Sequence, residues 1–340
     1  VASAWTGRQL EPGAEIRAGA VLGRYAFLIT LAAFLGTVWL HPLIANRRPD
    51  PAALHAASWR SFLLPLQALV LAGLLGAVLA LWAGLFRLVG IGFFAELFTE
   101  DWFLFPVLGL AFGIGVVLFR RRPELLGGLD DRLRLAMLLL LPLVLAITAA
   151  FLAVLPFTGL VALRDTGRGT ALLLWLLAVV CFFVNAVYAP GAPAPYPRTL
   201  GRCVGPALLL LLPVAALAGI GLALRIGRYG LTVERFWALV AWAMLAACAV
   251  ACAAAVLRLR GRWPAGLGPV SRGLSLVLLL VLFLAHTPVL DPRSLSVRSQ
   301  LGRVERGAIE AEELDFAYFR RALGRPGWLA LERLRAEHAD

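Results

Sequence analysis

The residues of this sequence that could do chemistry in its apolar parts are few and widely separated. Gln67 and Asn185 are neutral polar residues inside long apolar runs, and Glu96 is a carboxylate among phenylalanines. Polar groups in such surroundings either join helices by hydrogen bonds or line the path of a substrate or proton. We expect Asn185 to bridge helices and Glu96 to face water or a nearby arginine. A pathway role stays open as the alternative.

A denser group of polar and aromatic residues lies in the motif "RIGRYGLTVERFW". Gly230 suits the end of one helix, where φ is positive, and Thr232 suits the N-cap of the next helix. Tyr229 fits an aromatic belt, Glu234 fits the positive end of the second helix, and Arg235 stands where a capping box needs Glu or Gln. The motif therefore predicts a tight turn. Any further function is expected where it contacts the C-terminal tail or the short interfacial segment described below.

A third group is the aromatic and basic cluster in "DFAYFRRALG", with Tyr318, Arg320 and Arg321 as its candidate interaction residues. One interpretation is docking to a protein partner or to lipid headgroups, because aromatic and arginine side chains are common at such surfaces. The other is a helical cap folded over the outer ends of the membrane spans. The sequence leaves both open.

The motifs of common enzyme sites are missing from the sequence. It contains no G-x-S-x-G, no H-E-x-x-H and no phosphate-binding loop with its lysine, and its four cysteines form no C-x-x-C pair. An enzyme would need residues assembled from distant spans. We therefore predict no catalytic, cofactor-binding or metal-binding residues, no cofactor, and a protein that is not an enzyme.

The elements that position these residues are long apolar runs. Apolar residues make up 61% of the 340 residues, above the usual share of a soluble domain. The mean hydropathy is +0.85. The runs approach the roughly 20 residues that a helix needs to cross a bilayer. We predict an all-α polytopic transmembrane helix bundle with about eight spans, at residues 23–45, 62–87, 102–119, 134–157, 170–189, 204–224, 235–257 and 273–290.

Two further segments complete the predicted organisation. Residues 88–101, "LVGIGFFAELFTED", are apolar but too short to span, and they predict an interfacial helix lying against the membrane. Residues 291–340 carry as many acids as arginines and contain three short amphipathic patterns. The predicted domains are therefore a transmembrane bundle over 1–290 and a soluble helical C-terminal module over 291–340.

The net charge of +12 comes from arginine alone, since the sequence has no lysine, and the excess lies in short connections between apolar runs. This distribution is typical of a membrane protein that meets anionic lipid, so the lipid bilayer is the expected partner and nucleic acid is not. Arginines are more numerous in the connections after the first, third, fifth and seventh spans. The positive-inside rule then places the C-terminal module outside the cytoplasm. Because the chain begins with Val and shows no signal peptide, we expect a fragment or a processed form.

Several stretches, in this order, resemble bacterial membrane proteins of the domain of unknown function 4153 family. They are "GIGFFAELFTEDWFLFPV", "LPFTGL" with "ALLLWLLAVVCFFVNAVY", "RIGRYGLTVERFWAL", and "LDPRSLSVRSQLGRVERG" with "LDFAYFRRALGRPG". The resemblance implies a multi-spanning inner-membrane protein with a soluble C-terminal piece. It implies no reaction, ligand or catalytic residue.

The function expected from these observations is a non-catalytic scaffold or signalling partner in the bacterial cytoplasmic membrane, with an unidentified protein partner at the C-terminal module. The alternative is a transporter or channel for a neutral or lipidic substrate, using Gln67, Asn185 and helices interrupted by proline. A membrane-embedded enzyme is the third interpretation.

Overall fold

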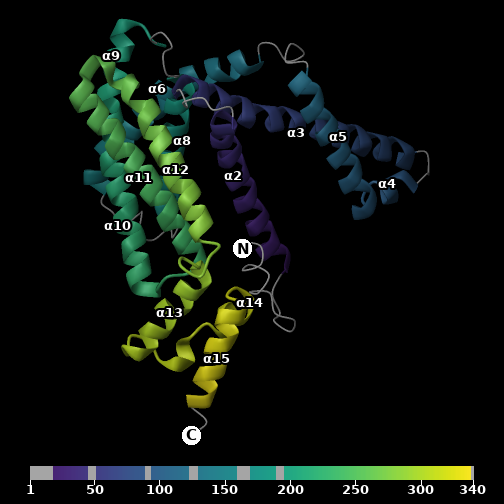
Figure 1. The fold of residues 1–340 in the computed structure, drawn as a ribbon, viewed down its shortest axis with the longest axis vertical. Helices are drawn as coiled ribbons and strands as arrows, with labels where there is room; N and C mark the ends of the chain where they lie inside the picture. Colours follow the sequence, from purple (N-terminus) through teal and green to yellow (C-terminus); the bar gives the residue numbers. More distant parts are fainter. Residues whose placement is uncertain are drawn as a thin grey trace. The chain divides into compact units, whose positions relative to one another are not determined.

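The computed structural model describes residues 18–44, 51–88, 93–121, 129–158, 169–188 and 195–337, and every regular element in these ranges is a helix (Figure 1). This confirms the all-α prediction. The α-helices are α2 (Ala18–Ile44), α3 (Pro51–Leu88), α4 (Phe93–Leu97), α5 (Asp101–Arg121), α6 (Leu129–Thr158), α8 (Gly169–Val187), α9 (Arg198–Ala207), α10 (Leu211–Tyr229), α11 (Val233–Leu259), α12 (Leu267–Leu284), α13 (Pro292–Glu305), α14 (Phe316–Arg321) and α15 (Arg325–Glu337). The 3₁₀ turns are η2 (Leu208–Leu210), η3 (Arg260–Gly266) and η4 (Ala311–Glu313).

Six helical stretches of the described chain are long and apolar enough to cross a membrane. They are Asp101–Arg121, Arg134–Phe157, Gly169–Val187, Arg198–Tyr229, Val233–Leu259 and Arg262–Leu284. They overlap the third to eighth predicted spans, but the last ends at Leu284 rather than at residue 290. The first two predicted spans fall on α2, which contains the shorter apolar helix Tyr25–Leu40, and on α3. A polytopic membrane protein is confirmed, and the total of eight spans stays a prediction.

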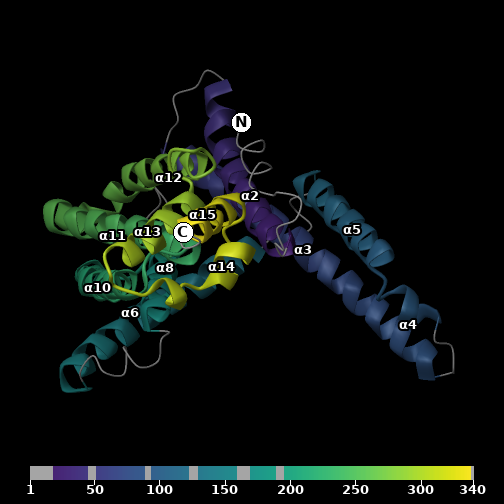
Figure 2. The same ribbon diagram turned by 90° about the horizontal axis from the view of Figure 1, so that it is seen from below.

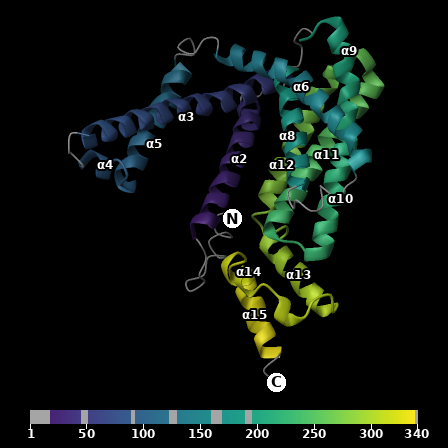
Figure 3. The same ribbon diagram turned by 180° about the vertical axis from the view of Figure 1, so that it is seen from behind.

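The chain divides into two compact units, residues 41–136 and residues 1–40 with 137–340. In the smaller unit α3 and α5 lie side by side, and α4 lies at one end of the pair (Figure 3). Their approach depends on small residues, because a Cβ on Gly115 would lie 3.1 Å from the backbone of Ala68. The predicted domain boundary at residue 290 does not separate these two units, because the larger unit includes the C-terminal module.

The predicted continuous helix over 88–101 is wrong in its extent. Within the described residues, α3 ends at Leu88 and α4 is a single turn, Phe93–Leu97. The short polar run after α4 ends it: the Thr99 hydroxyl donates to the Glu96 carbonyl at 2.8 Å. The Glu100 carbonyl then accepts the Phe103 and Leu104 amides of α5, at 3.1 and 2.9 Å. Side-chain competition of this kind favours helix ends over helix interiors.

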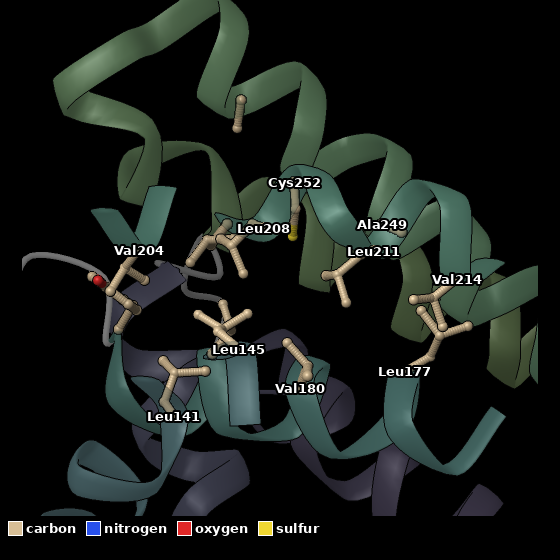
Figure 4. Close-up of a cluster of buried hydrophobic side chains, with 14 of the residues drawn as sticks. Leu141, Leu145, Leu177, Val180, Val204, Leu208, Leu211, Val214, Ala249 and Cys252 are labelled. Carbon is tan, nitrogen blue, oxygen red and sulfur yellow. The ribbon is translucent and has the colours of Figure 1, made fainter. Parts of the chain in front are cut away.

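The core of the larger unit lies among α6, α8, α11 and the stretch α9–η2–α10 (Figure 4). Leucines and valines from α6 and α8 face those of η2 and α10, and Cys252 of α11 points toward them. The residues are Leu141, Leu145, Leu177, Val180, Val204, Leu208, Leu211, Val214, Ala249 and Cys252. Between α10 and α11 the Trp242 indole donates to the Ala215 carbonyl at 2.8 Å, and Gly219 gives the ring its space.

One end of this unit is closed by aromatic side chains. The rings of Tyr188 and Trp263 are 4.6 Å apart, and Tyr196 lies 6.2 Å from Tyr188. Pro142 has no amide proton, so the Leu138 carbonyl of α6 lacks the usual helical donor four residues later. The Tyr196 hydroxyl donates to that carbonyl at 2.6 Å. The Tyr196 hydroxyl therefore takes the place of the backbone donor that Pro142 lacks.

The C-terminal module contains the three predicted helices. Asp291 caps α13 by accepting from Ser294, and positive φ values follow α13 at Gly307 and α14 at Gly324. The third helix begins at Arg325 and has Pro326 in its first turn, a position that suits proline. Gly327, within that turn, packs directly against Phe319. The core of the module consists of Val297, Leu314, Phe319, Leu323 and Ala330, joined by Val233 of α11.

Candidate functional site

The candidate site is the joint between the α10–α11 turn and the C-terminal module, both in the larger unit. Helix ends leave backbone amides and carbonyls without helical partners. Gly230 ends α10 with φ 71° and ψ 175°, and its amide donates to the Ile226 carbonyl at 2.8 Å. The Thr232 hydroxyl accepts the Arg235 amide at 3.3 Å. The predicted roles of Gly230 and Thr232 are confirmed, and further backbone groups of the turn are paired by the module.

The first pairing is between Leu231 and α13. Ser299 accepts the Leu231 amide at 2.9 Å, and the Ser296 hydroxyl donates to the Leu231 carbonyl, also at 2.9 Å. Both polar groups of one turn residue are thus bonded by side chains 65 and 68 residues further along the chain. Ser296 is fully buried, so these bonds are shielded from solvent.

The second pairing is between Val233, the first residue of α11, and Tyr318 of α14. The Val233 amide donates to the Tyr318 hydroxyl oxygen at 2.9 Å, and that hydroxyl lies 3.2 Å from Ser296 Oγ. Because Ser296 uses its proton on the Leu231 carbonyl, the Tyr318 proton goes to Ser296. The result is a relay in which each group has a partner: Val233 amide to Tyr318, Tyr318 to Ser296, and Ser296 to Leu231.

The third pairing covers the carbonyl end of α10. The Gln300 amide donates to the Tyr229 carbonyl at 3.0 Å, and Arg303 donates to the Arg228 carbonyl at 3.0 Å and to Gln300 Oε1 at 3.1 Å. Arg235 donates through Nη1 to the carbonyls of Tyr229 and Gly230, at 3.1 and 2.7 Å. Guanidinium groups at this position also favour the negative end of the helix dipole.

The apolar half of the joint lies beside these bonds. Val233 is buried with Val297 and Phe319, and Trp237 packs against the same cluster. Seen from below, α13, α14 and α15 lie nearest the viewer, next to α10, α11 and α12 (Figure 2). The module is therefore seated on the turn by an apolar cluster and a buried polar network together.

The outer side of the turn is basic and aromatic. Tyr229 is half exposed, and the guanidinium carbons of Arg228 and Arg235 each lie 5.5 Å from its ring centroid. Arg303 lies near Arg235, and Glu234 is an exposed carboxylate in the first turn of α11. The site can hold backbone groups and attract anions, because its guanidinium groups exceed its carboxylates.

A comparison with known protein families shows which family the chain belongs to. The family model described as "Domain of unknown function (DUF4153)" matches residues 1–334, which is nearly the whole chain. The chain belongs to this family. The resemblance found in the sequence is thus confirmed. No curated protein and no solved structure matches the chain.

In this DUF4153 member, the structure brings together Tyr229, Arg235 and Tyr318 from the predicted site residues, with Glu234 beside them. Arg320 and Arg321 are instead exposed. Their neighbour Phe319 is only 1% exposed and belongs to the module core. The aromatic and basic cluster predicted from the sequence is therefore divided, with Phe319 in the core and the arginines at the surface.

Three predicted residues lie outside the joint. Asn185 bridges α8 to α12: its Oδ1 accepts from the Ser271 hydroxyl at 2.9 Å, and its Nδ2 donates to the Cys181 carbonyl at 3.1 Å. This is the helix-bridging role expected for it. Glu96 is exposed on α4, and Gln67 is half-buried on α3, both in the smaller unit.

Sequence reasoning missed Ser296, Ser299, Gln300 and Arg303 of the DUF4153 chain. Their spacing of three, four and seven residues places them on one face of α13, next to the apolar stripe that begins at Val297. A polar stripe beside an apolar stripe is a detectable signal, but it does not say that the partner is a backbone turn. In the part of the chain that the structure describes, no group of three or more His, Cys, Asp or Glu residues is placed to hold a metal ion.

Proposed function

We propose that this DUF4153 protein is a non-catalytic membrane scaffold whose C-terminal module recruits a partner protein. The observation that carries the proposal is the joint, in which Ser296, Gln300 and Tyr318 bond the backbone of the α10–α11 turn. Such bonding fixes the module on the bundle and leaves its outer face available. A fixed surface binds with a smaller loss of conformational entropy than a tethered one.

The module exposes residue types that are common at protein-binding surfaces. Phe316, Trp328 and Leu329 are 46%, 43% and 38% exposed, although each is a large apolar side chain. Arg320 and Arg321 are exposed on the same module. Aromatic residues and arginine are enriched at protein interfaces and at the residues that dominate binding energy.

The transporter alternative receives less support from the described residues. Asn185, its main candidate in the larger unit, uses one amide donor on the Cys181 carbonyl and its Oδ1 on the Ser271 hydroxyl. These bonds support a role in joining α8 to α12 more directly than a role in a substrate path. The proposal contains no catalytic step.

A photo-crosslinking amino acid at Trp328 tests recruitment in intact membranes. We expect a discrete protein adduct, and we expect its loss when Phe316 or Leu329 is changed to Ser. The control position is Val250, which is 59% exposed within a membrane-spanning helix and should give lipid adducts only. Equal protein adducts at Trp328 and Val250, or an adduct indifferent to Phe316→Ser, would contradict the proposal.

We further propose that the protein lies in a bacterial cytoplasmic membrane with the module outside. The module and α9 lie at opposite ends of the α10–α11 pair (Figure 1). A membrane-impermeant thiol reagent should label Arg321→Cys in intact cells and Arg198→Cys only after lysis, both in a Cys203→Ser background that removes the exposed native thiol. The reverse pattern would invert the orientation.

A further inference from the structure

We propose that Arg228, Arg235 and Tyr229 form a binding site for the phosphate of an anionic phospholipid. This goes beyond the scaffold function and holds whether or not the module recruits a partner. Arg235 uses only Nη1 in its bonds to the Tyr229 and Gly230 carbonyls. A guanidinium has five N–H donors, so both arginines keep donors for a further acceptor.

The two guanidinium groups lie against the same aromatic ring. Each guanidinium carbon is 5.5 Å from the centroid of the Tyr229 ring. Arg225 and Arg303 add further positive charge next to Arg235, and Glu234 supplies a nearby carboxylate. Like charges held together repel, so an anion between them relieves an existing cost and gains charge-assisted hydrogen bonds.

The surroundings favour a phosphate carried on a lipid over free phosphate. Leu224 and Ile220 lie four and eight residues before Arg228 on α10, and each is 56% exposed. The i, i+4 spacing places all three on one stripe of the helix, with the guanidinium at its end. Because α10 belongs to a candidate membrane span, this stripe can lie along an acyl chain while the phosphate meets the arginines.

The surplus of guanidinium groups over carboxylates also selects the headgroup. A zwitterionic lipid brings its own ammonium group, which the arginines repel. An anionic phospholipid brings a phosphate without that group. The site should therefore prefer phosphatidylglycerol to phosphatidylcholine.

Native mass spectrometry of the full chain in detergent tests the site, with phosphatidylglycerol, phosphatidylcholine and inorganic phosphate as separate probes. We expect Arg228→Gln to weaken phosphatidylglycerol binding about tenfold, the effect of losing one charge-assisted contact. Arg228→Lys should retain most of the binding. The matched control is Arg258→Gln, an exposed arginine in the last turn of α11, and it should change binding less than about twofold.

Arg228 suits this test because the module bonds to its backbone carbonyl and not to its side chain, so the joint survives the substitution. An unchanged thermal unfolding midpoint of Arg228→Gln checks this. Equal losses in Arg228→Gln and Arg258→Gln would reduce the effect to general surface charge and overturn the proposal. Inorganic phosphate binding as tightly as the lipid, and lost with Arg228, would overturn the lipid assignment.

Discussion

The two ends of the larger unit solve one physical problem in different ways. At the aromatic end, Tyr196 donates to the Leu138 carbonyl that Pro142 leaves without a helical donor. At the other end, the backbone of the α10–α11 turn is bonded by Ser296 and Tyr318 of the C-terminal module. Both ends supply partners for backbone groups that a helix cannot satisfy, at a place where water is scarce.

The difference lies in the source of the partners and in what else they do. The aromatic end uses Tyr188, Tyr196 and Trp263, which pack as rings against each other and against Gly205. The module end uses hydroxyls, an amide and a guanidinium from a separate set of helices. A ring cluster closes the bundle, whereas a polar joint also holds an additional module in a fixed orientation. The proposed interaction of the module therefore depends on this polar joint.

Gly230→Ala should have the largest effect, because it introduces both backbone strain and a steric conflict at the module end. A Cβ there would lie 2.8 Å from Gln300 Nε2, and the φ of 71° disfavours any other residue. Strain and steric conflict together should cost about 3 kcal/mol and undock the module. Trypsin cleavage after Arg306 should accelerate. The control is Gly227→Ala, where a Cβ meets no atom within 4 Å, and equal cleavage of the two variants would falsify the role of Gly230.

Tyr318→Phe should have the next largest effect. It removes the acceptor of the Val233 amide and leaves that buried amide unpaired, and it removes the Tyr318 donor to Ser296, which still donates to the Leu231 carbonyl. The expected destabilisation is about 2 kcal/mol. Amide hydrogen exchange should rise at Val233 and along α13 and stay unchanged at the aromatic end. An unchanged exchange rate at Val233 would show that the relay is not formed.

Tyr196→Phe should cost less, about 1 kcal/mol, because a carbonyl tolerates the loss of a partner better than an amide does. A double-mutant cycle isolates the cause. Pro142→Ala restores the missing amide donor to the Leu138 carbonyl, so Tyr196→Phe should be close to neutral in that background. The thermal unfolding midpoints of the four proteins give the coupling. Additive effects would mean that Tyr196 does not compensate for the proline.

The smallest effect is a pH dependence at the aromatic end. Burial raises the pKa of Tyr196 from 10 to about 12, and burial and then the nearby Tyr196 raise the pKa of Tyr188. The folded state therefore holds both phenols neutral. Their stabilisation is present below pH 10 and is lost as pH rises from 10 through 12. Tyrosinate absorbance of the folded chain should show a late step near pH 12 that Tyr196→Phe removes. Complete ionisation by about pH 11 would contradict it.

The features that the sequence predicted well depend on local chemistry. Gly230 and Thr232 end and begin helices because of their own backbone and side-chain preferences. Apolar runs predicted the spans for a similar reason, since each run is a property of consecutive residues. Family membership also followed from stretches that are short and contiguous.

The features that it missed depend on contacts between distant residues. Ser296 and Gln300 read as ordinary polar positions of a surface helix, because their partners lie 65 and 71 residues away. Asn185 was expected to bridge helices, but its partner Ser271 could not be named in advance. The helix predicted over 88–101 is too long, because the prediction rests on the apolar residues of this segment and not on the polar run that ends α4.

The distance along the chain between Val233 and Tyr318 has a consequence for biosynthesis. The two residues are 85 positions apart, so the Val233 amide lacks this partner until the chain has been synthesised as far as Tyr318. At about 5–20 residues per second, the delay is roughly 4–17 seconds. During that interval the turn needs water as its hydrogen-bonding partner, so it must be held at the membrane surface. Synthesis of α13 and α14 then replaces that water, so two later helices complete the hydrogen bonding of a turn that was made before them.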